Sequence, residues 1–313
     1  MAGFILRRLL STIPVMLVVA IVVFLLLHLS PGDPAAIIAG DNATDADIEA
    51  VRATLGLDKP LLTQFFLWLG ALLHGDLGAS VFNKIPVWEL ITQRLEPTLS
   101  LAAVTMVFAI AIAIPLGVIA AWKAGTWIDH LIMGIAVLSF SAPVFLIGYG
   151  LVYRFARTWR MLPVQGYTPF AEDFSEWWRH LVLPAIALGL VFAALLARMT
   201  RSTMLDVLNE DYIRTARAKG LAPPAVLIRH ALSNAAVPIV TTIGLGIALL
   251  IGGVVVTESV FAIPGIGRLT IEAVTQRDYP VIQGVILIAS LVYVLINLAI
   301  DVAYAFLDPR IRY

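Results

Sequence analysis

The side chains best able to make specific polar contacts are concentrated in one segment between two long apolar runs. Glu210 and Arg214 stand four residues apart, in the order that favours an ion pair on a helix, worth about 0.2–0.5 kcal/mol. Such a segment offers ion pairing and hydrogen bonding to a partner surface. It comprises Glu210, Asp211, Arg214, Thr215, Ala216, Arg217, Ala218, Lys219 and Gly220, and the basic residues Arg198, Arg201 and Arg229 flank it.

The same segment carries an apolar stripe at helical spacing, formed by Leu205, Leu208, Tyr212, Ile213 and Ala216. Gly220 can end a helix in the left-handed conformation, and Pro223-Pro224 can begin another. The pattern predicts a helix, a glycine turn and a short helix on a membrane face. A solvated connector is the alternative, but the stripe and the glycine favour a docking element.

No arrangement of residues points to catalysis or to a bound cofactor. The motifs GxxxxGK[ST], HExxH and GxSxG do not occur in the sequence. The chain has no cysteine and therefore no thiol nucleophile. The histidines are scattered and suggest no metal site by their spacing. We therefore expect no catalytic residue, no metal site and no cofactor bound by this chain.

The composition identifies an integral membrane protein. Of the 313 residues, 60% are hydrophobic and 13% are charged, against about 25% charged in soluble domains. A membrane-spanning helix needs about 20 apolar residues, and six runs qualify: 9–29, 98–122, 131–153, 181–197, 237–256 and 281–306. These runs predict an all-α fold with six transmembrane helices in a lipid bilayer. The net charge of zero gives no reason to expect nucleic acid.

Charges in the loops predict the orientation. Arg7 and Arg8 place the N-terminus in the cytoplasm by the positive-inside rule. The run that follows exceeds the apolar core of about 7–15 residues in a signal peptide, so we expect a retained span. Loop 30–97 is acidic and lies outside, whereas the basic loop 199–236 lies inside, as does the C-terminus. Four arginines on the predicted outer side, at 154, 157, 160 and 179, run against the rule.

The predicted organisation has four parts. Residues 1–30 form the first span, and residues 31–96 form a small helical extracytoplasmic insertion. Residues 97–306 form a five-helix core containing loop 199–236, and residues 307–313 form a cytoplasmic tail. Within the insertion, helices are expected at about 44–56, from Pro60 onward and at 87–95. The apolar run 61–73 is too short to span a bilayer, so we expect an interfacial or packed helix.

Polar residues within the spans leave alternatives open. Ser139, Ser141 and Pro143 interrupt the third span and favour either a kink on a transport path or ordinary packing. Asn297 and Asp301 lie one turn apart on the last span. An ionisable residue at membrane depth suggests function, but Asp301 stands near the helix end, where Arg198 could pair with it. We favour the structural pairing over contact with a substrate.

A further turn is predicted at residues 261–268, after the fifth span. Its glycines permit positive φ and its proline prevents a continuous helix. The residues that define it are Phe261, Pro264, Gly265 and Gly267. We expect a tight turn, and treat a gate facing the extracytoplasmic side as a hypothesis.

Several ordered strings of residues resemble the permease subunits of ABC importers for dipeptides and oligopeptides, a family that includes peptide, nickel and glutathione systems. DYIRTARAKG at 211–220 resembles their variant of the EAA coupling loop, although Arg214-Thr215-Ala216 stands in place of Glu-Ala-Ala. The other strings are PGDP at 31–34, LGLDKP at 55–60, RMTR at 198–201, VFAIPGIG at 260–267, RDYP at 277–280 and LDPR at 307–310. The resemblance covers nearly the whole chain.

The resemblance implies a type I importer permease (MetI-like) fold in a bacterial inner membrane. It further implies a second homologous permease, two ATPase subunits carrying ATP and magnesium, and an extracytoplasmic substrate-binding protein. In this interpretation the charged segment couples transport to the ATPase. The alternative is a secondary transporter or channel that works without an ATPase. The sequence does not identify the substrate.

Overall fold

The computed structural model describes residues 2–29, 33–39, 43–54 and 56–307. The chain forms two compact units, the first comprising 1–95 and 269–298 and the second comprising 96–268 and 299–313. Helices α5 (Val87–Trp122), α12 (Ile266–Gln276) and α13 (Tyr279–Leu307) contribute residues to both units. The described residues are helical or irregular, apart from an isolated bridge between Ala79 and Pro86. The all-α prediction is confirmed.

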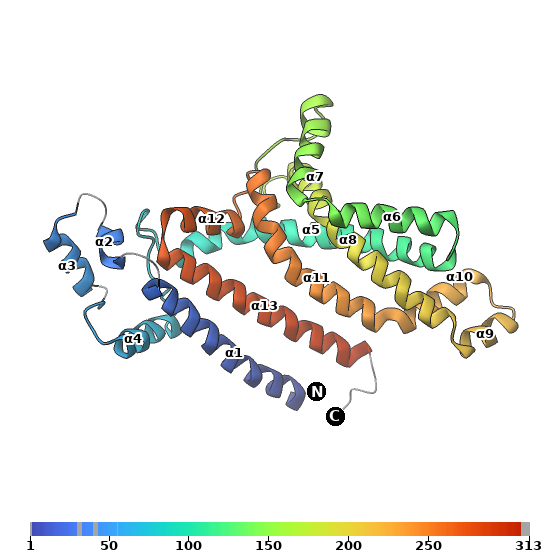
Figure 1. Ribbon diagram of the computed structural model, residues 1–313, viewed down its shortest axis with the longest axis horizontal. Coiled ribbons are helices and arrows are strands. Elements are labelled where there is room, and N and C mark those ends of the chain that lie inside the picture. The colour runs from blue at the N-terminus through green and yellow to red at the C-terminus, as the bar shows by residue number, and fades with distance from the viewer. Residues whose placement is uncertain (1, 30–32, 40–42, 55, 308–313) are drawn as a thin grey trace. The chain divides into compact units, whose positions relative to one another are not determined.

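The first unit is built on α1 (Ala2–Leu29) and the N-terminal part of α13, which run side by side (Figure 1). Their contact buries Ala20, Val23 and Leu287. Gln283 Nε2 donates a hydrogen bond to the Val23 carbonyl at 3.1 Å. The insertion after α1 contains α2 (Pro34–Ala39), α3 (Asp45–Thr54) and α4 (Leu61–Leu73).

The second unit is organised around α8 (Phe174–Leu208), which packs against α6 (Trp127–Ser141), α7 (Val144–Leu151) and α11 (Ser233–Val260). Two apolar cores lie along α8, one containing Leu196 and Met204 and the other Leu181 and Leu188. Close helix approach depends on glycine, because a Cβ at Gly246 would lie 1.7 Å from Phe192 Cε2. The π-helices η1 (Val152–Thr158) and η2 (Val226–Leu232), with α9 (Asp211–Ala218) and α10 (Pro223–Ala225), complete the unit.

Five helices in the described residues are long and apolar enough to cross a membrane, and a sixth segment passes that test only as a bent pair. The third span predicted at 131–153 is present as this bent pair of helices. The chain turns by 101° between α6 and the helix that begins at Val144, as Figure 1 shows for α6 and α7. Pro143 lacks an N–H, and Ala142 before it takes an extended conformation (φ −79°, ψ 129°). The predicted interruption is present as a complete break.

The insertion also differs in detail from the prediction. Residues 87–95 are not a separate helix but the first turns of α5, which continues through Pro97 and Pro115. Helix α2 was not predicted. Pro60 precedes the first helical residue of α4 and serves as its N-cap. Gly56 adopts φ +66°, in the left-handed region that glycine favours, and α3 ends before it.

Candidate functional site

The charged segment forms α9, a two-turn helix that follows directly on α8. The chain leaves the helical conformation at Glu210 (φ −68°, ψ 147°), and α9 begins at Asp211. A carboxylate in the first turn of a helix is favoured by the helix dipole. The prediction of one helix carrying a single apolar stripe is therefore wrong: Leu205 and Leu208 belong to α8, and Tyr212 is 42% exposed.

Two side chains anchor α9 to the rest of the second unit. Ile213 is fully buried and Ala216 nearly so. Ile213 belongs to the same apolar core as Met204 and Leu208 of α8 and Leu227 of η2. Through these contacts α9 is packed against η2 and joined to the C-terminal end of α8 by their shared apolar core, so a displacement of α9 acts on both.

The residues of α9 and its ends other than Ile213 and Ala216 are exposed. Those that form the charged segment, here called the charged face, are Glu210, Asp211, Arg214, Thr215, Arg217, Ala218, Lys219 and Gly220. Arg214 pairs with Asp211, three residues away, so the predicted Glu210–Arg214 pair is wrong. Within the described part of the chain, Arg217 and Lys219 make no ion pair. Partial burial, with the Glu210 carboxylate adding to its effect, raises the pKa of Tyr212.

Gly220 ends α9 as predicted. Its φ is +78°, and no atom outside its chain neighbours lies within 4 Å of where a Cβ would stand. The glycine is therefore required by the backbone conformation and not by space. Ala222 and Pro223 then begin α10, so the predicted sequence of helix, glycine turn and short helix is confirmed.

A buried ion pair fixes α8 to α6 near this site. Arg201 binds both oxygens of Asp129, with Nε 2.5 Å from Oδ1 and Nη2 2.6 Å from Oδ2. The Gly125 N–H donates to Oδ2 at 3.0 Å, and Asp129 is only 1% exposed. Sequence analysis placed Arg201 in the basic cluster but missed Asp129. The signal available was a lone carboxylate in the first turn of an apolar helix.

The turn at 261–268 is organised by a second residue that sequence analysis missed. Glu258 is fully buried at the end of α11. It accepts hydrogen bonds from Thr98 Oγ1 at 2.6 Å and from the Arg268 N–H at 2.9 Å. A Cβ at Gly265 would lie 2.0 Å from Glu258 Oε1. The predicted tight turn is present, and Gly265 is needed there because the carboxylate fills the space beside it.

The other predicted turn residues are close to this carboxylate or to α11. Phe261 is 3% exposed and lies in an apolar core, and its carbonyl accepts a hydrogen bond from the Gly166 N–H at 3.1 Å. A Cβ at Gly267 would lie 2.6 Å from Val255 Cα. Pro264 is half-buried. The role of this turn as a gate stays a prediction.

The polar residues predicted within the spans belong to both compact units. Ser139 is half-buried and Ser141 is exposed at the end of α6. Asn297 is exposed and donates to the Tyr293 carbonyl of its own helix at 2.9 Å. Arg198 is exposed and makes no ion pair with Asp301 in the described residues. The function of Asp301 stays a prediction.

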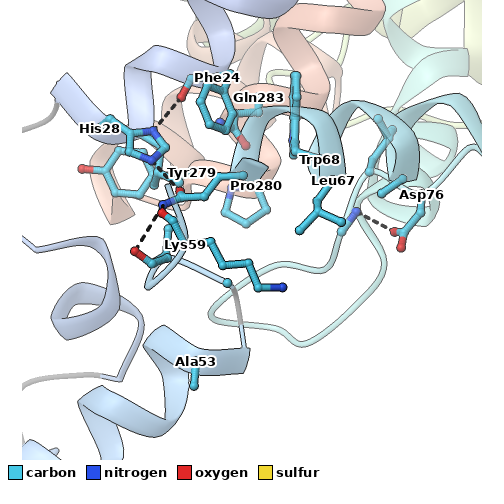
Figure 2. A pocket seen from close by; sticks show the side chains of 17 residues that line it. Phe24, His28, Ala53, Lys59, Leu67, Trp68, Asp76, Tyr279, Pro280 and Gln283 are labelled. Carbon is cyan, nitrogen blue, oxygen red and sulfur yellow. Dashed lines mark hydrogen bonds between the residues drawn. The ribbon is translucent and has the colours of Figure 1, made fainter. Parts of the chain in front are cut away.

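The first unit contains a cavity of about 460 Å³ beside α1 and α4 (Figure 2). Aromatic and aliphatic side chains line most of it, and the charged side chains of Lys59 and Asp76 line it as well. Gln64 Nε2 donates to the carbonyls of Leu57 and Lys59, which leaves its Oε1 to accept from His28 Nε2 at 2.8 Å. The amide nitrogen and the amide oxygen of Gln64 therefore both have hydrogen-bond partners.

Two protein-family descriptions match this chain, one over its N-terminal third and one over the remainder. Residues 113–313 match the family described as binding-protein-dependent transport system inner membrane component. Residues 1–102 match the N-terminal region described for membrane components of the same transport systems.

Similar proteins cover the full length. The chain is 52% identical over 313 residues to the probable peptide ABC transporter permease protein y4tP of Sinorhizobium fredii, covering 100% of both chains. It is 42% identical to the dipeptide transport system permease protein DppB of Escherichia coli K12, covering 100% of this chain and 99% of that protein.

The fold resembles that of a solved transporter. A chain of the inward-facing MetNI methionine ABC transporter matches with a TM-score of 0.56 and 18% identity, covering 71% of this chain and 97% of that chain. At this identity the likeness concerns the fold alone. Together with the family match, these findings show that the chain belongs to the binding-protein-dependent inner membrane components, the permease subunits of ABC importers.

Proposed function

We propose that this chain is one of two homologous permeases of a peptide importer, and that the charged face of α9 is the docking site of an ATP-binding cassette subunit. The peptide substrate is supported by the names of the relatives, a peptide permease and a dipeptide permease. Two ATPase subunits would hold ATP and magnesium, and an extracytoplasmic binding protein would deliver the substrate. This chain would bind no cofactor.

The observation that carries the proposal is the division of α9 into two faces. Ile213 and Ala216 fix the helix to the membrane-spanning core. Arg217 and Lys219 make no ion pair with an acidic residue in the described part of the chain. A helix that is anchored on one side and charged on the other suits a rigid contact with a soluble partner.

Coupling between the ATPase and the transport pathway would depend on the packing of two separate helices and not on one continuous helix. Since the chain leaves the helix at Glu210, α8 and α9 are separate helices joined by the core that contains Ile213 and Met204. Closure of the ATPase dimer would displace α9 together with the end of α8. Close-packed interfaces switch between discrete arrangements and do not deform continuously, so the displacement would favour one orientation of the pathway between the two permeases.

The proposal is tested with Arg217→Glu, which reverses a charge that has no partner within the described chain. Arg157→Glu is the matched control, because Arg157 is also exposed but lies on η1, at the other end of α8. In the reconstituted complex we expect Arg217→Glu to lower ATPase stimulation by loaded binding protein about tenfold, a change within the usual range of energetic coupling between two sites. Unchanged stimulation in an assembled Arg217→Glu complex would refute docking at the charged face.

The alternative of a carrier or channel working without an ATPase finds no support among the relatives or the similar structure. The substrate is best determined by capturing the binding protein of the same system and identifying its ligand by mass spectrometry. Recovery of a ligand without peptide bonds would contradict the proposed substrate class and leave the docking site untouched.

A further inference from the structure

Helix α4 exposes an uncharged apolar surface. None of its 13 residues is buried, and its sequence contains only two polar side chains, Thr63 and Gln64. The amide of Gln64 is hydrogen-bonded to His28 and to the carbonyls of Leu57 and Lys59. Its large exposed side chains are Leu61 (48%), Leu62 (72%), Phe66 (66%), Leu67 (54%) and Leu73 (78%).

The other side of α4 packs on α1, a helix long and apolar enough to cross a membrane. The Phe24 ring lies 5.3 Å from the Phe65 ring and 5.7 Å from the Trp68 ring. Trp68 also packs against the core formed by Ala20 and Val23. All these contacts fall on the last turns of α1.

The position along α1 sets the depth of α4. From Ala20 to the end of α1 at Leu29, a rise of about 1.5 Å per residue gives about 14 Å. The hydrocarbon core of a bilayer is about 30 Å thick. The contacts with α4 therefore lie within the half of the bilayer at the C-terminal end of α1.

We propose that α4 is embedded in that lipid leaflet, with Leu62, Phe66 and Leu73 in contact with acyl chains. A helix of 13 residues is about 20 Å long and cannot span the bilayer. Exposed polar residues at its two ends, Lys59 before it and Asp76 after it, mark where the chain returns to the membrane surface. The leaflet is the outer one in the topology proposed here, but the contact with lipid does not depend on that orientation.

Lipid fits this face better than a protein partner does. A protein interface carries a polar rim and about one hydrogen bond per 100–200 Å², whereas the exposed face of α4 offers hydrocarbon and a single hydroxyl. The surface also continues that of α1, whose exposed side chains, such as Val15 and Val18, are equally apolar. A helix with one face on a span and the other uncharged suits the lipid phase.

The test uses the absence of cysteine from the chain. Leu62→Cys, Phe66→Cys and Leu73→Cys are each labelled with an environment-sensitive fluorophore in the assembled importer, with cysteine-free partners, in phosphatidylcholine–phosphatidylglycerol nanodiscs. Quenching by lipids with a nitroxide on the acyl chain is compared with quenching by aqueous iodide. Val15→Cys on α1 is the control for lipid contact, and Glu49→Cys on α3 is the control for water.

We expect the α4 labels to be quenched by the nitroxide lipid at least half as strongly as the Val15 label and to resist iodide. Iodide quenching equal to that at Glu49 would place α4 in water and overturn the proposal. Insensitivity to both quenchers would place the face against a partner protein and overturn it equally. Because three highly exposed sites are used, loss of one variant through poor assembly leaves two that decide the question. None of these outcomes depends on ATPase coupling.

Discussion

At the scale of single residues, the polar groups that matter most are two buried carboxylates. Asp129 and Glu258 are each almost completely removed from solvent and surrounded by donors. Burying a charge is costly unless it is paired and hydrogen-bonded. Each carboxylate therefore joins elements that are distant in sequence: Asp129 holds α6 to α8, and Glu258 holds the end of α11 to Thr98 of α5 and to the following turn.

We expect Asp129→Asn to destabilise the subunit by about 1–3 kcal/mol, because it leaves the Arg201 guanidinium without its counter-charge. Arg201 is 28% exposed, so the cost should stay below that of a fully buried pair. Thermal unfolding of the assembled complex measures it. Asp206→Asn, which removes an exposed carboxylate on the helix that carries Arg201, should leave the melting temperature unchanged. The double variant with Arg201→Gln should recover part of the loss, and a melting temperature equal to wild type for Asp129→Asn alone would contradict the assigned role.

We expect Gly265→Ala to destabilise the turn at 261–268 by about 1–3 kcal/mol, because the new methyl group would overlap the Glu258 carboxylate. Gly252→Ala is the matched control, since no atom lies within 4 Å of a Cβ at that position. The two variants are compared by the amount of assembled complex and by its melting temperature, and both quantities should be lower for Gly265→Ala. Equal behaviour of both variants would show that the carboxylate does not occupy that space.

At the scale of elements, the sequence predicts helices well and their breaks poorly. Apolar length identified five of the spans, and glycine and proline marked the end of α9 and the start of α10. The break at Glu210 was missed because the apolar stripe continues in phase across it, although the backbone leaves the helical conformation at Glu210. The break at Pro143 was predicted only as an interruption, because its 101° angle depends on the packing of α7. Asp129 was missed because one carboxylate has no spacing pattern until its partner is known.

We expect Ile213→Ala to loosen α9 from the core at a cost of about 2–4 kcal/mol, because Ile213 is fully buried. The charged face itself would be unchanged, so a loss of ATPase stimulation would show that anchoring as well as charge is required for coupling. Ile228→Ala on η2 is the control, since that isoleucine is 63% exposed. Hydrogen exchange over residues 211–218 should rise in Ile213→Ala alone. Unchanged exchange would show that α9 is held by other contacts.

At the scale of the whole molecule, the family assignment establishes that the chain is a permease subunit of an ABC importer. It does not establish the direction in which the chain crosses the membrane. The loop charges predict that the insertion carrying α3 is extracytoplasmic and that α9 is cytoplasmic. The exposed arginines of η1 run against this rule on the predicted outer side. The Arg154 guanidinium lies over the Trp159 ring, and Arg179 of α8 pairs with the Glu176 carboxylate.

Single cysteines at Glu49 on α3 and Asn209 at the end of α8 test the orientation, since both positions are exposed and the chain has no cysteine of its own. In osmotically shocked cells with an intact inner membrane, a membrane-impermeant maleimide should label Glu49→Cys and not Asn209→Cys. After permeabilisation both should react, which shows that each thiol is accessible. Labelling of position 209 alone in the shocked cells would invert the topology, place the charged face of α9 away from any cytoplasmic ATPase, and so refute the proposed coupling together with the orientation.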